Sequence, residues 1–113
     1  MDLMWFLLLG HLTGDFALQS DHMAQRKGTS IAVLTAHVVV YTLCIAVGLY
    51  GFRLCVGVWG AGTALTGLLL ALLFSVHWAQ DFIKSRYFHS RQAFYVDQTL
   101  HVLQLFALRW LLM

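Results

Sequence analysis

Histidine and aspartate recur four residues apart in this sequence, inside stretches that are otherwise apolar. The pairs are His11 and Asp15, His77 and Asp81, and, in the reverse order, Asp97 and His101. A spacing of four residues places two side chains on one face of an α-helix, with Cβ atoms about 5–6 Å apart. Imidazole and carboxylate groups are common ligands of divalent metals. These spacings therefore indicate metal binding.

The elements that carry these pairs must be helices in a bilayer. Of the 113 residues, 60% are hydrophobic and only 11% are charged, which is too apolar for a water-soluble domain of this size. The net charge of +2 gives no sign of a nucleic-acid-binding surface, so no nucleic-acid partner is expected. We predict an all-α, polytopic membrane protein that forms a single integral membrane domain over residues 1–113.

Each span needs about 20 mostly apolar residues, and four segments qualify. They are Leu3 to Gln19, Ile31 to Tyr50, Leu54 to about Lys84, and Ala93 to Met113. The loops after the first and third segments carry five Lys and Arg residues, whereas the opposite side has only Arg53 and Arg109. By the positive-inside rule, both termini face outward. We predict a four-transmembrane-helix bundle in the bacterial inner membrane.

An internal repeat relates the two halves of the chain, approximately residues 3–50 and 54–113. The string from His11 to Phe16 returns from His77 to Phe82, and Thr35-Ala-His37-Val returns as Thr99-Leu-His101-Val. Each copy enters the membrane from the same side, as in parallel-repeat membrane proteins. The sequence thus predicts two parallel helix hairpins.

The polar residues of the spans are also matched in depth. At 1.5 Å per residue, the aspartates lie about 6 Å and the histidines about 9–12 Å from the cytoplasmic ends of their helices. Charged groups in a span cost about 2.5–3.5 kcal/mol each, so they indicate a functional site. The predicted metal ligands are His11, Asp15, His37, His77, Asp81, Asp97 and His101.

Each half supplies two histidines and one aspartate, the ligand set of metal sites with open positions. The first set is His11, Asp15 and His37, and the second is His77, Asp81 and His101. We expect one or two divalent ions, with zinc favoured and iron or manganese as alternatives. Such an ion activates water as a nucleophile at neutral pH.

Two further residues receive catalytic roles. Asp97 has Val33 as its counterpart in the first half, so this extra carboxylate could bridge the metals or act as a general base. Lys84 could orient an anionic substrate, although a role as a headgroup anchor was the stronger alternative. Gln19, Gln80 and Gln98 could donate hydrogen bonds to the ligands.

The preferred function is metal-dependent hydrolysis of a membrane-associated ester, most plausibly a phosphoester. The depth of the site, open to the cytoplasmic leaflet, favours membrane lipid or another amphiphile as substrate. A non-catalytic metal-binding or metal-transport protein is the main alternative. A b-type haem protein would use the four histidines but leave the three aspartates unexplained.

The polar string resembles a known family. The string runs His11-x-x-x-Asp15-Phe-x-Leu-Gln, then Lys27, then His37, then Asp81-x-x-Lys84, then Asp97-Gln-x-x-His101. It resembles a small bacterial and phage inner-membrane family of unknown function. The resemblance covers nearly the whole chain. More distantly, the chain is similar to membrane-bound metal-dependent hydrolases related by analogy to zinc phospholipase C, and this similarity implies a hydrolase without indicating its substrate.

Two features concern packing. Cys44 and Cys55 are expected at the outer ends of the second and third spans, where a disulfide would be chemically permitted, although small buried apolar residues are the preferred interpretation. Gly57, Gly60, Gly62 and Gly67 form a helix-packing face on the third span. That face could also support a homo-oligomer.

Overall fold

The computed structural model describes residues 2–56 and 62–113 and is all-α. The elements are α1 (Leu3–Leu12), the π-helical turn η1 (Thr13–Ala17), α2 (Asp21–Arg26), α3 (Ile31–Val56), α4 (Thr63–Tyr87) and α5 (Arg91–Leu112). The chain contains no proline, so no residue of that type interrupts the long apolar helices. The prediction of an all-α fold is confirmed.

Side chains cap α1, α2, α3 and α5. The carboxylate of Asp2 accepts from the N–H of Met4 at the start of α1. The hydroxyls of Ser20, Ser30 and Ser90 accept from backbone N–H groups in the first turns of α2, α3 and α5. These oxygens satisfy N–H groups that have no partner within the helix. Ser90 starts α5 at Arg91, two residues before the predicted start of the fourth span.

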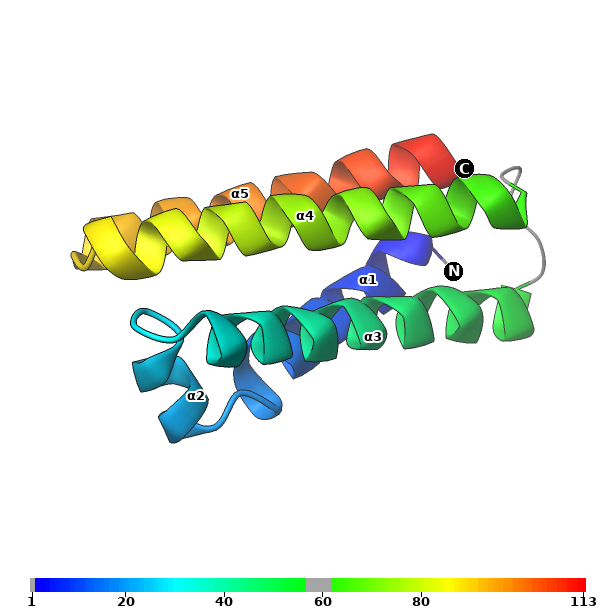
Figure 1. Ribbon diagram of the computed structural model, residues 1–113. Coiled ribbons are helices and arrows are strands. Elements are labelled where there is room, and N and C mark those ends of the chain that lie inside the picture. The colour runs from blue at the N-terminus through cyan, green and yellow to red at the C-terminus, as the bar shows by residue number, and fades with distance from the viewer. Residues whose placement is uncertain (1, 57–61) are drawn as a thin grey trace.

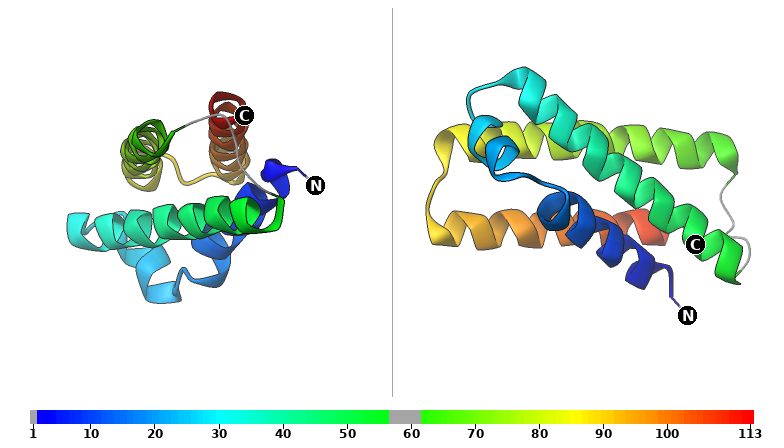
Figure 2. Two further views of the ribbon diagram at one scale, coloured as in Figure 1. Left: turned by 90° about the vertical axis from the view of Figure 1, so that its right-hand side faces the viewer. Right: turned by 90° about the horizontal axis from the view of Figure 1, so that it is seen from below.

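The helices pack in an antiparallel arrangement around one apolar core. Helices α4 and α5 lie side by side, and α3 crosses them together with α1 (Figures 1 and 2). The α4–α5 turn and the start of α3 lie at one end of the molecule, and both termini lie at the other (Figure 1). Both predicted cytoplasmic loops are therefore at the same end.

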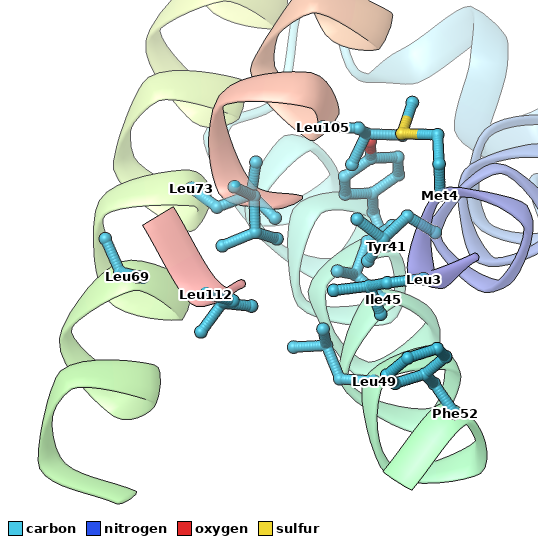
Figure 3. Packing of buried hydrophobic residues seen from close by; sticks show 12 residues of the cluster. Leu3, Met4, Tyr41, Ile45, Leu49, Phe52, Leu69, Leu73, Leu105 and Leu112 are labelled. Carbon is cyan, nitrogen blue, oxygen red and sulfur yellow. The ribbon is translucent and has the colours of Figure 1, made fainter. Parts of the chain in front are cut away.

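The apolar core occupies the half of the molecule that carries both chain termini. Its fully buried residues include Leu3, Leu7, Ile45, Leu49 and Leu105. Figure 3 shows the core side chains of α1 and α3 pointing toward those of α4 and α5. This packing fills the end of the molecule that lies away from the α4–α5 turn.

Close backbone approach joins α1 to α3. A Cβ atom added at Gly48 would lie 2.6 Å from the carbonyl oxygen of Phe6, and one added at Gly10 would lie 2.8 Å from that of Cys44. A Cβ atom this close to a backbone oxygen would clash, so the two helices can cross here only because both positions are glycine.

Two helices, α3 and α4, are long and apolar enough to cross a membrane, with mean hydropathy of 2.2 and 1.4 over their best 18-residue windows. The helix lengths do not support the predicted repeat. The first half contains α1, η1 and the separate helix α2, whereas the corresponding part of the second half is the single long helix α4.

Several predicted boundaries were wrong. The first segment ends as a helix at Ala17, and the short helix α2 was not expected. Helix α3 continues to Val56, beyond the predicted Tyr50, because no proline follows and a single glycine, Gly51, costs only about 1 kcal/mol in a helix interior.

Cys44 and Cys55 consequently lie on one helix, and both are free thiols. Eleven residues of helix separate their Cα atoms by about 16 Å, whereas a disulfide needs less than about 7 Å. The expected placement on two neighbouring helices was therefore wrong. Of the predicted glycine face, Gly57 and Gly60 lie outside the described residues, and Cβ atoms added at Gly62 or Gly67 would meet no atom within 4 Å.

Candidate metal centre

The structure brings all seven predicted ligand side chains together in its interior. None is more than 5% exposed, and they come from α1, η1, α3, α4 and α5. The residues are His11, Asp15, His37, His77, Asp81, Asp97 and His101. Charged and imidazole groups that are buried this deeply need partners of complementary chemistry.

Asp81 lies at the middle of this cluster. Its Oδ2 atom is 3.1 Å from Nε2 of His37 and 3.3 Å from Nε2 of His77. Its Oδ1 atom is 3.2 Å from Nε2 of His101. One carboxylate thus faces three imidazoles, with two on one oxygen and one on the other.

Ligand atoms converge at two points. Asp15, His37, His77 and Asp81 each present an atom within 4.8 Å of the others, and so do Asp81, Asp97 and His101. Asp81 belongs to both groups, as a carboxylate that bridges two ions would. The first group combines residues of both halves, whereas each predicted set drew its ligands from one half. The second group keeps Asp81 and His101 of the second predicted set, with Asp97 in place of His77.

Neighbouring ligand atoms around a tetrahedral zinc ion, at 2.0–2.1 Å from the metal, are about 3.3 Å apart. The four imidazole–carboxylate distances in the first group span 3.1 to 3.6 Å. Nε2 of His37 and Nε2 of His77 thus lie at ion-pair distance from these carboxylates. Such a buried cluster could hold a metal ion or form a salt-bridge network.

His11 lies beside the two groups and belongs to neither. Its Nδ1 is 3.0 Å from the hydroxyl of Tyr41, and its Nε2 is 3.0 Å from Oε1 of Gln98. The nearest oxygen of Asp15 is 3.8 Å from Nδ1. As placed, His11 is a neighbour of the ligands, although the sequence spacing predicted a ligand.

Asp15 reaches the cluster from a π-helical turn. η1 follows α1 directly, and Gly14 within it would bring an added Cβ to 2.9 Å from Cα of Tyr41. Such turns are rare and occur frequently at functional sites. Oδ1 of Asp15 lies 3.2 Å from Nε2 of His37, so this contact between η1 and α3 joins two residues of the first predicted set.

Lys27 supplies a buried positive charge that the sequence did not identify as part of the site. Its Nζ donates to Oε1 of Gln19 at 2.9 Å and to Oδ2 of Asp81 at 3.3 Å. A Cβ added at the next residue, Gly28, would lie 2.9 Å from the carbonyl oxygen of Ser85, so the loop contacts α4 closely here. The sequence interpretation used Lys27 for topology and as one residue of the string that resembles a known family, without giving it a role at the site.

Lys84, the predicted substrate-orienting residue, lies outside the cluster. Its Nζ is 5.7 Å from the ring centroid of Phe94, and the residue lines a cavity at the end of the molecule. Within the segments 2–56 and 62–113, no carboxylate lies within ion-pair distance of Lys84.

Amide side chains surround Asp97. Gln80 donates from Nε2 to Oδ1 of Asp97 at 3.0 Å, and Gln98 donates to Oδ2 at 3.3 Å. The expected donor role of these two amides matches their contacts. Gln19 instead accepts from Lys27.

Tyr41 is a further member that the sequence interpretation missed. It is completely buried, and its ring centroid is 3.9 Å from that of His77. Its position four residues after His37 on α3 was the available signal, because it places both residues on one helix face.

The comparisons with known proteins identify a family without an assigned activity. No curated protein and no solved structure matches the chain. A family model described as "Protein of unknown function (DUF3307)" matches residues 3–113. Since the match covers nearly the whole length, the chain belongs to this family.

Proposed function

We propose that this protein is a four-span membrane metalloprotein that hydrolyses a membrane-associated phosphoester. The distribution of polarity supports the membrane setting. Large apolar side chains such as Leu54 (88% exposed), Val47 (72%) and Trp110 (82%) cover the outside, while carboxylates and histidines fill part of the interior. An exposed apolar surface this extensive is unfavourable in water and suits lipid.

α3 and α4 provide two spans by length and hydropathy. The proposed third and fourth spans are α1 with η1, and α5 with its buried Asp97 and His101. Polar groups that face the bundle interior are compatible with a span. The loop charges favour a cytoplasmic position for the α4–α5 turn, in the bacterial inner membrane.

The convergence of ligand atoms on Asp81 is the observation that carries the metal assignment. Three carboxylates are buried here, and Lys27 is the buried lysine that contacts one of them, so a net negative charge remains while the four histidines are neutral. One or two divalent cations would neutralise it. A bound ion of this kind supplies Lewis acidity and lowers the pKa of water, which is the chemistry of metal-dependent hydrolases.

The chain's own residues would divide the remaining work. Asp97 lines a groove between α4 and α5, so its carboxylate can accept a proton from a water molecule that attacks a substrate there. Gln80 and Gln98 hold both oxygens of this carboxylate in place. Lys27 stabilises Asp81 as the anion.

The packing favours a small ion over haem. The ring centroids of His77 and His101 are stacked 4.1 Å apart. The ring centroid of Tyr41 lies 3.9 Å from that of His77 and 6.1 Å from that of His101. This packing leaves no flat space for a porphyrin between these rings. Transport is disfavoured because the apolar core of Leu3, Leu49 and Leu112 fills the bundle beyond the cluster.

The test combines metal analysis with an ester assay on the purified full-length protein. We expect one to two equivalents of Zn, Fe or Mn per chain. Asp81→Asn should lose both ions because both groups use Asp81, whereas His101→Ala should lose one. His22→Ala, an exposed position on α2, should lose none. Metal-free wild type after growth in metal-rich medium, with unaltered thermal stability on metal addition, would refute the site.

Catalysis is tested separately with a panel of lipid phosphates and soluble phosphoesters. Asp97→Asn should keep much of the metal and lower turnover by about 10²–10⁴, the usual contribution of a general base, whereas loss of an ion would identify Asp97 as a ligand instead. Full metal occupancy without turnover of any ester by wild type would indicate the alternative function, a non-catalytic metal-binding protein.

A further inference from the structure

Two cavities adjoin each other at the end of the molecule that carries the α4–α5 turn. One, of about 450 Å³, lies between the α2–α3 loop and this turn, and the other, of about 680 Å³, lies along α4 and α5. Lys84, Phe88 and Ser90 line both. Their volumes fall in the range of small-molecule sites.

The first cavity is cationic. Lys27, Lys84, His89 and Arg91 line it, and none of its lining residues is acidic. In the part of the chain that the structure describes, neither Lys84 nor Arg91 has a carboxylate within 4 Å. The N-terminus of the 22-residue helix α5 also opens here and adds partial positive charge. The bound group should therefore be an anion, and phosphate suits such a set of donors.

The second cavity is a groove of different character. Val76, Ile83, Val96 and Leu100 supply an apolar lining, and Asp97 and Gln80 lie on its wall. Ile83 and Val96 are each about half exposed, so the groove opens onto the lipid-facing surface. It thus joins the bilayer to a carboxylate of the metal cluster.

We infer that the two cavities together bind one anionic phospholipid, with the phosphate in the cationic cavity and an acyl chain in the groove. Charge complementarity selects the headgroup, and the apolar lining selects the chain. A free phosphate would leave the groove unused, and a neutral lipid would leave Lys84 and Arg91 without an anion. The ester bonds between headgroup and chain then lie along the wall that holds Asp97. This inference rests on the proposed function only for what happens to the lipid after it binds.

Binding is measured on purified full-length protein stripped of metal with EDTA, in neutral detergent. The probes are dioctanoyl phosphatidic acid, dioctanoylglycerol and inorganic phosphate. Phosphatidic acid should bind at least about tenfold more tightly than either other probe. The double variant Lys84→Gln with Arg91→Gln should weaken phosphatidic acid binding by about tenfold or more. Arg26→Gln, an exposed cation outside both cavities, is the matched control and should not change it.

A second experiment blocks the groove with a large side chain. Val96→Trp should weaken phosphatidic acid binding and leave phosphate binding unchanged, whereas Leu103→Trp, an exposed position of α5 outside the groove, should affect neither. Equal affinity for phosphate and phosphatidic acid, or tight binding in the Lys84 and Arg91 double variant, overturns the inference. If a variant fails to fold, Ile83→Trp or Lys84→Gln alone replaces it.

Failure of the inference and failure of the proposed function give different results. Lipid binding without turnover in the metal-loaded protein supports the lipid site and contradicts the hydrolase. Metal-dependent turnover that is unaffected by Val96→Trp and by the double variant supports the hydrolase and contradicts the lipid site.

Discussion

Individual charged side chains in this protein are paired with specific partners, and the clearest case is the buried ion pair between Lys27 and Asp81. Lys27 contacts the carboxylate shared by both ligand groups. Removing one partner of a buried ion pair leaves a charge without compensation, at a cost of about 3–5 kcal/mol. Metal and lysine should therefore share the task of neutralising the cluster.

Lys27→Met should lower the thermal stability of the metal-free protein more than that of the metal-loaded protein. A divalent ion on Asp81 would compensate for the lost ammonium group, whereas no other lysine or arginine contacts Asp81 among the described residues. Thermal unfolding in detergent, with and without metal, measures the difference. The neighbouring exposed Arg26→Met provides the control. Equal destabilisation in both states would argue against a metal at Asp81.

At the opposite end, Arg109 donates two hydrogen bonds to Asp2, at 2.7 and 2.8 Å. The hydrogen bond from Arg109, with one from the N–H of Met4, lowers the pKa of Asp2 from 3.8 to about 2. A carboxyl whose pKa is lowered by folding stabilises the protein above its unfolded pKa, and this contribution disappears as pH falls through the folded value.

The melting temperature of wild type should therefore exceed that of Asp2→Asn at pH 7. The gap should begin to narrow below about pH 4 and should close near pH 2. The pair is solvent-exposed, so we expect a small gap that also decreases at high salt. A difference in melting temperature that stays constant from pH 7 to pH 2 would mean that the charge of the Asp2 carboxylate does not contribute to stability.

At the scale of elements, the crossing of α1 and α3 determines where the ligands meet. The α1 and η1 segment carries His11 and Asp15, and α3 carries His37 and Tyr41. The backbones approach closely at Gly10 and Gly48. A shift of this crossing would move Asp15 away from His37, because the two residues come from different elements.

Gly48→Ala should destabilise the fold by about 1–3 kcal/mol and reduce metal occupancy, because its Cβ would lie 2.6 Å from the carbonyl oxygen of Phe6. Gly67→Ala is the matched control, since its Cβ would meet no atom within 4 Å and alanine favours a helix interior by about 0.5–1 kcal/mol. Denaturation and metal analysis of both variants test this. Equal effects of the two substitutions would exclude the α1–α3 approach as the cause.

At the scale of the molecule, the two ends differ in charge and in packing. The end with the α4–α5 turn has Lys27, Lys84 and Arg91 around a cavity, and the other end has the apolar core and both termini. This polarity supports a single orientation in the bilayer, with the cationic end in the cytoplasm.

Cysteine labelling tests this orientation in a background with Cys44 and Cys55 changed to serine. Thr29→Cys should react with a membrane-impermeant maleimide only after cell lysis, whereas Met113→Cys should react in intact spheroplasts. The segment that joins α2 to α3 and the C-terminus lie at opposite ends of the molecule, so each position serves as a control for the other (Figure 1). Labelling of both positions from one side would contradict a bundle that crosses the membrane.

The sequence by itself determined the helical class and the residues that gather in the interior. Apolar runs without proline can satisfy their backbone groups only as helices in lipid, and a spacing of four residues gives the same helix face without knowledge of the fold. The burial of all seven predicted ligand residues agrees with that local rule.

Only the tertiary structure decided which ligands share a point in space. The rotation and crossing of each helix depend on packing between elements, as at Gly48 against Phe6, and no spacing within one helix encodes them. For this reason the ligand sets predicted from each half differ from the two observed groups, which share Asp81. His11 belongs to neither group. Lys27 reaches Asp81 from a loop 54 residues away in the sequence, where Gly28 lets that loop approach α4.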